Sequence, residues 1–109
     1  LEAISAYEEA HGASATLSSW QAFVERYPSN AVGQFALANG LYADQQADEA
    51  RNAFKRATTL DPTMGAAWLN LGILLLQNDE PEEARAALNK AANLEGEWQD
   101  RAQQLLDGM

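Results

Sequence analysis

Small and apolar residues recur along the chain with the spacing of amphipathic α-helices. Between residues 65 and 77 they stand at Trp68, Leu71, Gly72 and Leu75, which is the i, i+3, i+4, i+7 spacing of one helical face. Polar breaks, prolines and glycines interrupt this pattern at regular distances. The pattern predicts seven helices joined by short connections, at residues 2–11, 14–27, 31–43, 47–60, 65–77, 81–94 and 97–107.

The helix predicted at 81–94 shows how the sequence marks helix ends. Pro81 suits the first turn, where a missing backbone N–H costs no hydrogen bond. Glu82 and Glu83 suit the positive end of the helix dipole, and Gly96 is expected to close the helix. Two ion pairs of i, i+3 spacing are predicted on helix surfaces: Asp48 with Arg51, and Glu82 with Arg85.

Composition narrows the fold class and the classes of partner. The chain holds 22 alanines but only eight valines, isoleucines and threonines together, so a β-sheet would lack the branched side chains that suit a pleated surface. Sixteen acidic and seven basic side chains give a net charge of −9, which disfavours nucleic acid and acidic membranes as partners. Without cysteine, the chain forms no disulfide and no thiolate metal site.

Membrane insertion by this fragment is not expected. The longest apolar run, Leu71 to Leu76, is far shorter than the ~20 residues that span a bilayer. No charged and then apolar signal segment opens the chain. Because the sequence begins at Leu1 rather than at a methionine, the localisation stays open.

The sequence repeats itself with a period of 34 residues. Eight identities at this one offset are hard to obtain by chance: Leu37 and Leu71, Leu41 and Leu75, Glu49 and Glu83, Ala50 and Ala84, Arg51 and Arg85, Ala53 and Ala87, Ala57 and Ala91, Leu60 and Leu94. A looser third copy at the N-terminus contains Tyr7, Trp20 and Pro28. Each copy corresponds to a pair of predicted helices.

These residues resemble the tetratricopeptide repeat family, whose 34-residue pattern places Trp, Leu, Gly and Tyr in a first helix and Ala, an aromatic residue or Leu, Ala and Pro in a second. The last copy supplies Trp68, Leu71, Gly72, Leu75, Ala84, Leu88, Ala91 and Gly96. The middle copy supplies Gln34, Leu37, Ala38, Leu41, Ala50, Phe54, Ala57 and Pro62. Gln34 in place of Trp and Gly96 in place of Pro are departures, which are expected to weaken those corners. The first copy has Thr16 where a small residue belongs.

The resemblance implies an all-α fold, a right-handed superhelical stack of antiparallel helix pairs. We expect one domain, 1–109, with a degenerate first repeat, two regular repeats and a capping helix, at about 1–30, 31–64, 65–98 and 97–107. Ala50 and Ala84 are expected where two helices cross, because a larger side chain would push the backbones apart. The capping helix carries one apolar stripe, Trp98, Ala102, Leu105 and Leu106.

Candidate catalytic and metal-binding groups are few. His11 is the one histidine, with Tyr7 and Glu8 one turn away, but no nucleophile or substrate pocket is evident beside it. The acidic run from Asp79 to Glu83 has the composition of a calcium site, yet it also has the composition of a helix start. No glycine-rich phosphate loop or zinc-ligand spacing is present. We therefore predict a protein that is not an enzyme and that has no catalytic residue, metal or cofactor.

Apolar surface beyond what packing needs indicates a binding groove. In the helix at 65–77, Leu69, Ile73 and Leu76 form a second apolar stripe, and a helix that is apolar on two faces needs two partners. The resemblance implies that the first helix of each repeat lines a concave groove. The predicted groove residues are Glu2, Ser5, Glu8, Phe35, Asn39, Tyr42, Leu69, Asn70, Ile73, Leu76 and Gln77.

The chemistry of this row predicts a protein or peptide partner with apolar anchors and a basic end, the basic end lying toward Glu2, Glu8 and Glu9. Asn39 and Asn70 resemble the asparagines of cochaperones that clamp a carboxylate. However, Phe35, Asp100 and Gln104 stand where cations would be expected, so that partner is disfavoured. The leading hypothesis is a non-catalytic adaptor. Two others stay open: a homo-oligomer assembly module that uses the same groove, and an accessory domain of a larger enzyme or of a membrane-anchored assembly factor.

Overall fold

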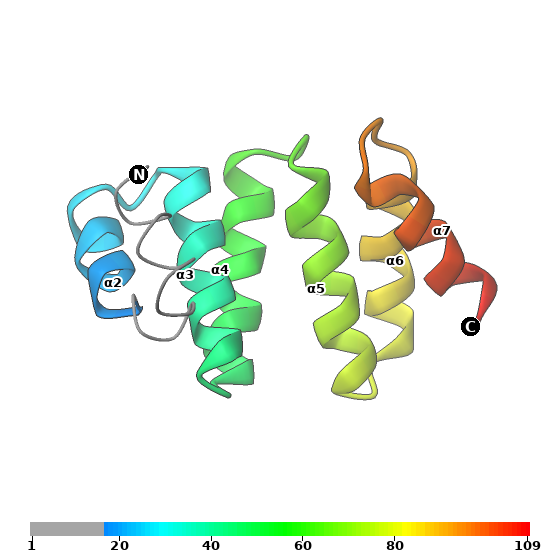
Figure 1. The fold of residues 1–109 in the computed structure, drawn as a ribbon, viewed down its shortest axis with the longest axis horizontal. Helices are drawn as coiled ribbons and strands as arrows, with labels where there is room; N and C mark the ends of the chain where they lie inside the picture. Colours follow the sequence, from blue (N-terminus) through cyan, green and yellow to red (C-terminus); the bar gives the residue numbers. More distant parts are fainter. Residues whose placement is uncertain (1–16) are drawn as a thin grey trace. The chain divides into compact units, whose positions relative to one another are not determined.

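All elements in the part of the chain that the structure describes are helices. The computed structural model describes residues 17–109, and the chain divides into two units, Leu1–Leu60 and Asp61–Met109. The first unit contains α2 (Leu17–Arg26), α3 (Ala31–Ala43) and α4 (Ala47–Leu60). Figure 1 shows α3 and α4 as an antiparallel pair, and α2 packs against α3.

An aromatic core holds α2 against α3. Trp20 is 2% exposed and its ring meets Phe23 edge-on, with the ring centroids 5.7 Å apart. Phe23 in turn lies over Gly33, where an added β-carbon would stand only 2.7 Å from the ring. Asn30 caps the start of α3 by accepting a 2.8 Å hydrogen bond at Oδ1 from the backbone N–H of Gly33. Gly33 is therefore needed for the close approach of the two helices.

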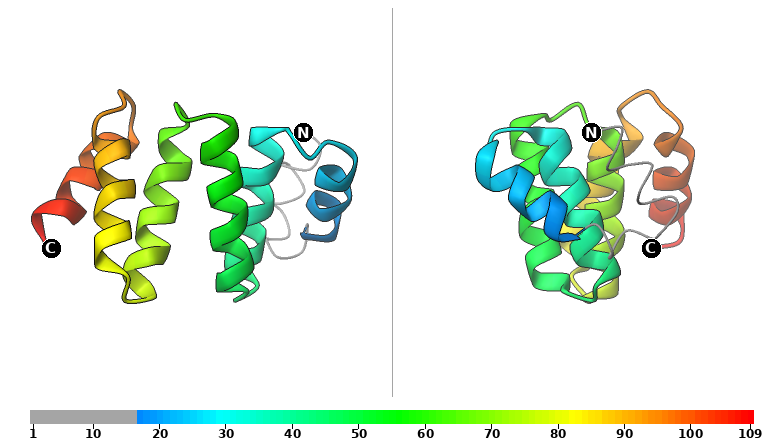
Figure 2. Two further views of the ribbon diagram at one scale, coloured as in Figure 1. Left: turned by 180° about the vertical axis from the view of Figure 1, so that it is seen from behind. Right: turned by 60° about the vertical axis from the view of Figure 1, so that its left-hand side comes forward.

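The second unit contains α5 (Gly65–Gln77), α6 (Pro81–Ala92) and α7 (Trp98–Asp107). Figure 2 shows α5 and α6 as a second antiparallel pair, and α7 packs mainly against α6. The pair crosses closely at Gly72, where an added β-carbon would stand 2.6 Å from Leu88 Cδ2, next to the buried Ala84. Small residues at this crossing allow the two backbones to approach each other.

Two turns, one in each unit, have the same backbone conformation. Gln45 follows α3 with a φ of 63°, and Asp79 follows α5 with a φ of 59°. In each turn the next backbone N–H donates a 2.9 Å hydrogen bond to a carbonyl near the end of the preceding helix. This is a helix C-terminus closed by a left-handed residue, a conformation that glycine adopts most readily. The two residues are one repeat apart, so the 34-residue period extends to the turns.

The structure confirms the all-helical fold and most of the predicted helix ends. The bounds of α3, α4 and α5 are those predicted, and α6 begins at Pro81 as predicted. The predicted ion pair between Asp48 and Arg51 is present, with 3.8 Å between Oδ1 and Nη2.

Some helix ends differ from the predicted ones by one or two residues. The sequence predicts that α6 runs to residue 94 and is closed by Gly96, but it ends at Ala92 with Asn93 as its cap. In the loop that follows, the carbonyl of Leu94 accepts a 3.1 Å hydrogen bond from Trp98 Nε1. The helix predicted at 14–27 ends at Arg26 and the one predicted at 97–107 begins at Trp98, whereas residues 2–11 and 14–16 lie outside the described residues.

Candidate protein-binding surface

Three of the predicted groove residues lie along α3, and we call Phe35, Asn39 and Tyr42 the α3 face. Phe35 and Asn39 are half-buried, whereas Tyr42 is 41% exposed. The Phe35 ring tilts against the buried ring of Phe54 from α4, with 6.1 Å between the ring centroids. This packing restrains the Phe35 ring. The α3 face therefore combines a restrained aromatic ring, an amide and an exposed phenol.

Five further predicted residues lie along α5, and we call Leu69, Asn70, Ile73, Leu76 and Gln77 the α5 face. Gln77 is exposed and the other four are half-buried. Leu69 and Leu76 also pack against a buried cluster of Leu88, Ala91 and Ala102 from α6 and α7. Packing within the same unit thus covers part of the second apolar stripe of α5.

The predicted acidic end of the groove lies outside the described residues. Glu2, Ser5 and Glu8 are among the first sixteen residues of the chain, as is His11, the one histidine. The position of the basic end of a ligand and the role of His11 therefore stay predictions.

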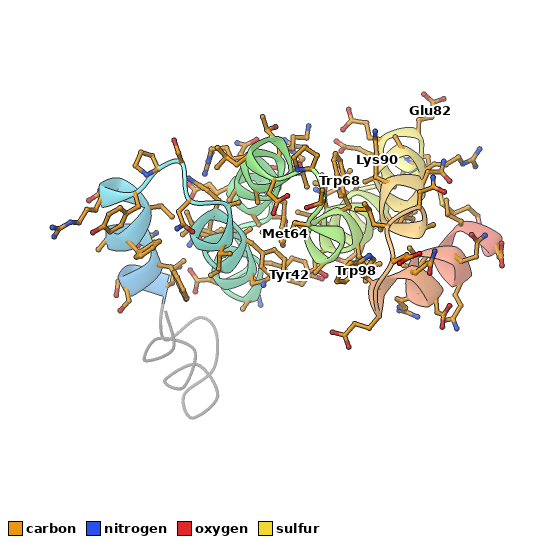
Figure 3. The ribbon with its side chains drawn as sticks, turned by 90° about the horizontal axis from the view of Figure 1, so that it is seen from above. Tyr42, Met64, Trp68, Glu82, Lys90 and Trp98 are labelled. Atoms are coloured by element: carbon orange, nitrogen blue, oxygen red, sulfur yellow. The ribbon has the colours of Figure 1, made fainter. Side chains whose placement is uncertain are left out.

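The acidic run before α6 is a helix start. Pro81 is the first residue of α6, and Glu82 and Glu83 lie in its first turn, as the sequence predicts. Figure 3 shows Glu82 projecting away from α6. Among residues 17–109, no three histidine, cysteine or acidic side chains come together as a metal site would require. The cluster is explained by the helix dipole.

A second acidic group is held in the turn before α5. Asp61 Oδ1 accepts a 2.6 Å hydrogen bond from the Thr63 hydroxyl and a 3.0 Å bond from the Thr63 backbone N–H. These bonds, the hydroxyl first, lower the pKa of Asp61 below its ordinary value, because they stabilise the ionised form. Asp61 therefore stays ionised at neutral pH and stabilises the turn.

A polar hollow that the sequence analysis missed lies in the first unit, on α2, α3 and α4. Its volume is about 200 Å³, and we call it the α2–α4 hollow. Buried Leu37 and Leu41 of α3 form its floor, and four exposed polar side chains surround them: Gln21, Glu49, Asn52 and Arg56. The available signal was Glu49 and Arg56 seven residues apart on one helix, but the contribution of α2 required the tertiary structure.

Comparison with known proteins identifies the family. The tetratricopeptide repeat family profile matches residues 41–107, which is more than half of the chain. The chain belongs to the tetratricopeptide repeat family. This confirms the resemblance drawn from the 34-residue period, and it supports a role as a scaffold for protein–protein interaction.

Curated relatives match this chain over a small part of their own length. The human cell division cycle protein 16 homolog is 38% identical over 72 residues, an alignment that covers 65% of this chain and 12% of the relative. Anaphase-promoting complex subunit 6 of Dictyostelium discoideum is 31% identical over 64 residues, covering 59% of this chain and 7% of the relative. The chain thus spans about one eighth or less of these relatives.

A solved structure supports the fold. The crystal structure of MamA superimposes with a TM-score of 0.81 at 17% sequence identity, covering 98% of this chain and 72% of that chain. At this identity the likeness concerns the fold alone. No helix within residues 17–109 is long and apolar enough to cross a membrane.

The tetratricopeptide repeat pattern accounts for the most buried positions of both units. Ala50 and Ala84, one repeat apart, are each fully buried, as the helix-crossing position requires. Gln34 on α3 and Trp68 on α5 occupy the pattern's tryptophan position. Neither residue belongs to the α3 face or the α5 face. Most of the pattern residues on the helices therefore lie in the core.

Proposed function

We propose that the protein is a non-catalytic adaptor that binds a polypeptide along the α3 face and the α5 face. The ligand carries apolar anchors, and its basic end lies toward Glu2, Glu8 and Glu9. The proposal extends the groove predicted from the sequence to the side chains that the structure describes. It assigns recognition to the first helix of each tetratricopeptide repeat.

The exposed Tyr42, on the same side of α3 as the restrained Phe35, is the observation that carries this proposal. An aromatic ring that is 41% exposed buries further apolar surface when a ligand covers it. Tyrosine is also among the residues that contribute most to binding energy at protein interfaces. On α3 it stands one turn from Asn39, so one ligand segment can contact both.

Two asparagines supply the polar part of this recognition. Asn39 and Asn70 each take part in an interaction within the chain, yet an amide side chain has two donor hydrogens and an acceptor oxygen with two lone pairs. Hydrogen bonds to a peptide backbone fix the position of the ligand without requiring a particular ligand sequence.

The relatives support a protein partner rather than a small molecule. One of them is named as a subunit of the anaphase-promoting complex, a multi-protein assembly by its name. The packing of Leu69 and Leu76 against the core of their own unit leaves less apolar surface on the α5 face for any partner, whether a foreign polypeptide or a second copy of the chain. The oligomeric state separates these two alternatives.

Site-specific photo-crosslinking tests the proposal. A photoreactive phenylalanine analogue is placed at Tyr42 or at Ile73, and for the control at Arg51 or at Ala86. Each variant is exposed to a cell lysate, and the crosslinked proteins are identified by mass spectrometry. We expect a shared partner from Tyr42 and Ile73 that is missing from both controls. A partner captured only through the control positions would contradict the groove.

A further inference from the structure

The α2–α4 hollow has the construction of a second docking site. A buried side chain orients its arginine: Arg56 Nε donates a 3.0 Å hydrogen bond to Gln34 Oε1. The Gln34 side chain is 3% exposed, and its Nε2 donates at 3.0 Å to the carbonyl of Pro28, so both ends of the amide are held. A buried amide fixed in this way restrains Arg56, while the terminal nitrogens of the guanidinium keep their capacity to donate to a carboxylate.

The rest of the rim is not engaged. In the described part of the chain, the side chains of Gln21, Glu49 and Asn52 make no hydrogen bond or ion pair. Glu49 and Arg56 lie seven residues apart on α4, which places them on one face and about 10 Å apart along the helix axis. The hollow thus has a negative end, a positive end and an apolar floor between them.

This hollow lies on another side of α3 than the α3 face. Successive residues of an α-helix are rotated by about 100°, so Leu37 and Leu41 lie about 150° around α3 from the centre of the α3 face. A partner in the hollow therefore does not compete for Phe35, Asn39 or Tyr42. Its existence does not depend on the proposed groove.

We propose that the α2–α4 hollow docks a helix of a partner protein that presents an acidic side chain and a basic side chain two turns apart, with an apolar side chain between them. The acidic group pairs with Arg56 and the basic group with Glu49, while the apolar side chain covers the floor of Leu37 and Leu41. The amides of Gln21 and Asn52 accept and donate hydrogen bonds at the edge. Charge complementarity selects this occupant.

A helix suits the hollow better than an extended strand. Helices satisfy their own backbone hydrogen bonds, and the lining of the hollow offers side chains and no strand edge. A second copy of this chain is a poorer occupant. Its α4 carries the acidic and basic groups at the right spacing, but Asn52 stands between them where an apolar residue is needed to cover the leucines.

The probe is an alanine-rich helical peptide with Glu, Leu and Lys at positions i, i+3 and i+7, titrated into the ¹⁵N-labelled full chain and followed by NMR. We expect saturable shifts of the side-chain amides of Gln21 and Asn52 and of Arg56 Nε. A peptide with Lys, Leu and Lys at the same positions should bind about threefold more weakly, the usual size of one exposed ion pair. Shifts centred on the Asn39 amide instead, or no saturable shift, would overturn the proposal.

Protein variants with matched controls test the charge pairs. Arg56→Gln should weaken binding of the Glu, Leu, Lys peptide about threefold, whereas Lys55→Gln removes the same charge from the neighbouring position and should leave binding unchanged. Glu49→Lys should make a peptide with Glu at both charged positions bind best. Equal effects of Arg56→Gln and Lys55→Gln, or an unchanged preference in Glu49→Lys, would show that the hollow does not select this charge pattern.

Two further measurements separate the hollow from the alternatives. Replacing Asn39 and Asn70 by alanine should not change the affinity for the probe peptide, so failure of the groove and failure of the hollow are distinguishable. Sedimentation of the chain without peptide tests for a second copy as occupant. A dimer that Glu49→Lys dissociates would show that the hollow is a self-association site and would overturn the proposed heterologous helix.

Discussion

Gln34 and Trp68, one repeat apart, make the same hydrogen bond. Gln34 Nε2 donates at 3.0 Å to the carbonyl of Pro28, and Trp68 Nε1 donates at 2.8 Å to the carbonyl of Pro62. In each case the acceptor is the proline six residues earlier, in the connection before the helix. The Gln that replaces Trp therefore preserves the hydrogen bond between helix and loop. The expectation that this replacement weakens the corner does not take that bond into account.

Removing this hydrogen bond from the first unit should cost more stability than removing the equivalent hydrogen bond from the second unit. Gln34→Leu leaves the Pro28 carbonyl and Arg56 without this partner, so we expect a loss of about 1–3 kcal/mol in the free energy of unfolding. Trp68→Phe keeps most of the ring and removes one bond from a half-buried site, and should cost about 0.5–1.5 kcal/mol. Urea unfolding measures both. A Gln34→Leu protein as stable as the wild type would show that the amide contributes nothing.

The two left-handed turns offer a stabilising change. Gln45 and Asp79 hold a φ near 60°, which costs an ordinary residue about 1–2 kcal/mol and glycine much less. Gln45→Gly and Asp79→Gly should therefore each raise the midpoint of thermal unfolding. The control is Ala86→Gly, at an exposed position inside α6, which should lower stability by about 1 kcal/mol. Destabilisation by all three glycines would mean that the turns are not strained.

The helix crossing of the second unit should not accept a larger residue. Ala84 is fully buried beside Gly72 and Leu88, so Ala84→Leu should lower the free energy of unfolding by about 1–3 kcal/mol. Ala86→Leu adds the same atoms on an exposed face and should change stability little. Thermal unfolding followed by circular dichroism compares the two variants. Equal losses of stability in the two variants would contradict the repeat alignment, which places Ala84 in the core and Ala86 on the surface.

Much of the fold follows from residues close together in sequence. The start of α6 is predictable because Pro81 and two glutamates act within one turn, and the crossing at Ala84 is predictable because the 34-residue period marks it twice. The end of α6 was not predictable. The chain leaves the helix after Ala92, and the hydrogen bond from Trp98 Nε1 to the Leu94 carbonyl in the following loop leaves no periodic signal in the sequence.

The candidate sites, too, are predictable from the sequence only in part. The α3 face follows from helical spacing alone, since Phe35, Asn39 and Tyr42 share one side of α3. How far Leu69 and Leu76 are covered depends on the packing of α6 and α7, which the pattern along α5 does not contain. The α2–α4 hollow requires three helices at once, and Gln34, the residue that supports Arg56 in it, departs from the family pattern.

Oligomeric state tests the self-association alternative directly. We expect the protein to sediment as a monomer over a wide concentration range, because Leu69 and Leu76 pack against their own unit and leave less apolar surface for another copy. Ile73→Glu should then leave the sedimentation coefficient unchanged. A wild-type dimer that Ile73→Glu converts to a monomer would instead show that the α5 face binds a second copy.

Once a partner is captured, the contribution of individual groove residues can be measured. Replacing both Asn39 and Asn70 by alanine should remove hydrogen bonds of about 0.5–1.5 kcal/mol each, which together reduce affinity by roughly tenfold without unfolding the chain. Tyr42→Ala should cost more, because an aromatic anchor combines apolar contact with a hydrogen bond. Calorimetry with each purified variant gives these values. Ala86→Ser is the control for a substitution on an exposed face outside the groove.

The charges of the predicted acidic end should act on the rate of association. Reversing Glu2, Glu8 and Glu9 to lysine should slow association with a partner whose basic end meets them, and should flatten the dependence of that rate on salt, because charges at the rim mainly steer the encounter. Dissociation should change little. Stopped-flow measurements at low and high salt separate the two rates. If the reversal left association unchanged while a change at Arg85, on α6, slowed it, the ligand would approach the second helices of the repeats, and the orientation assigned to it here would be wrong.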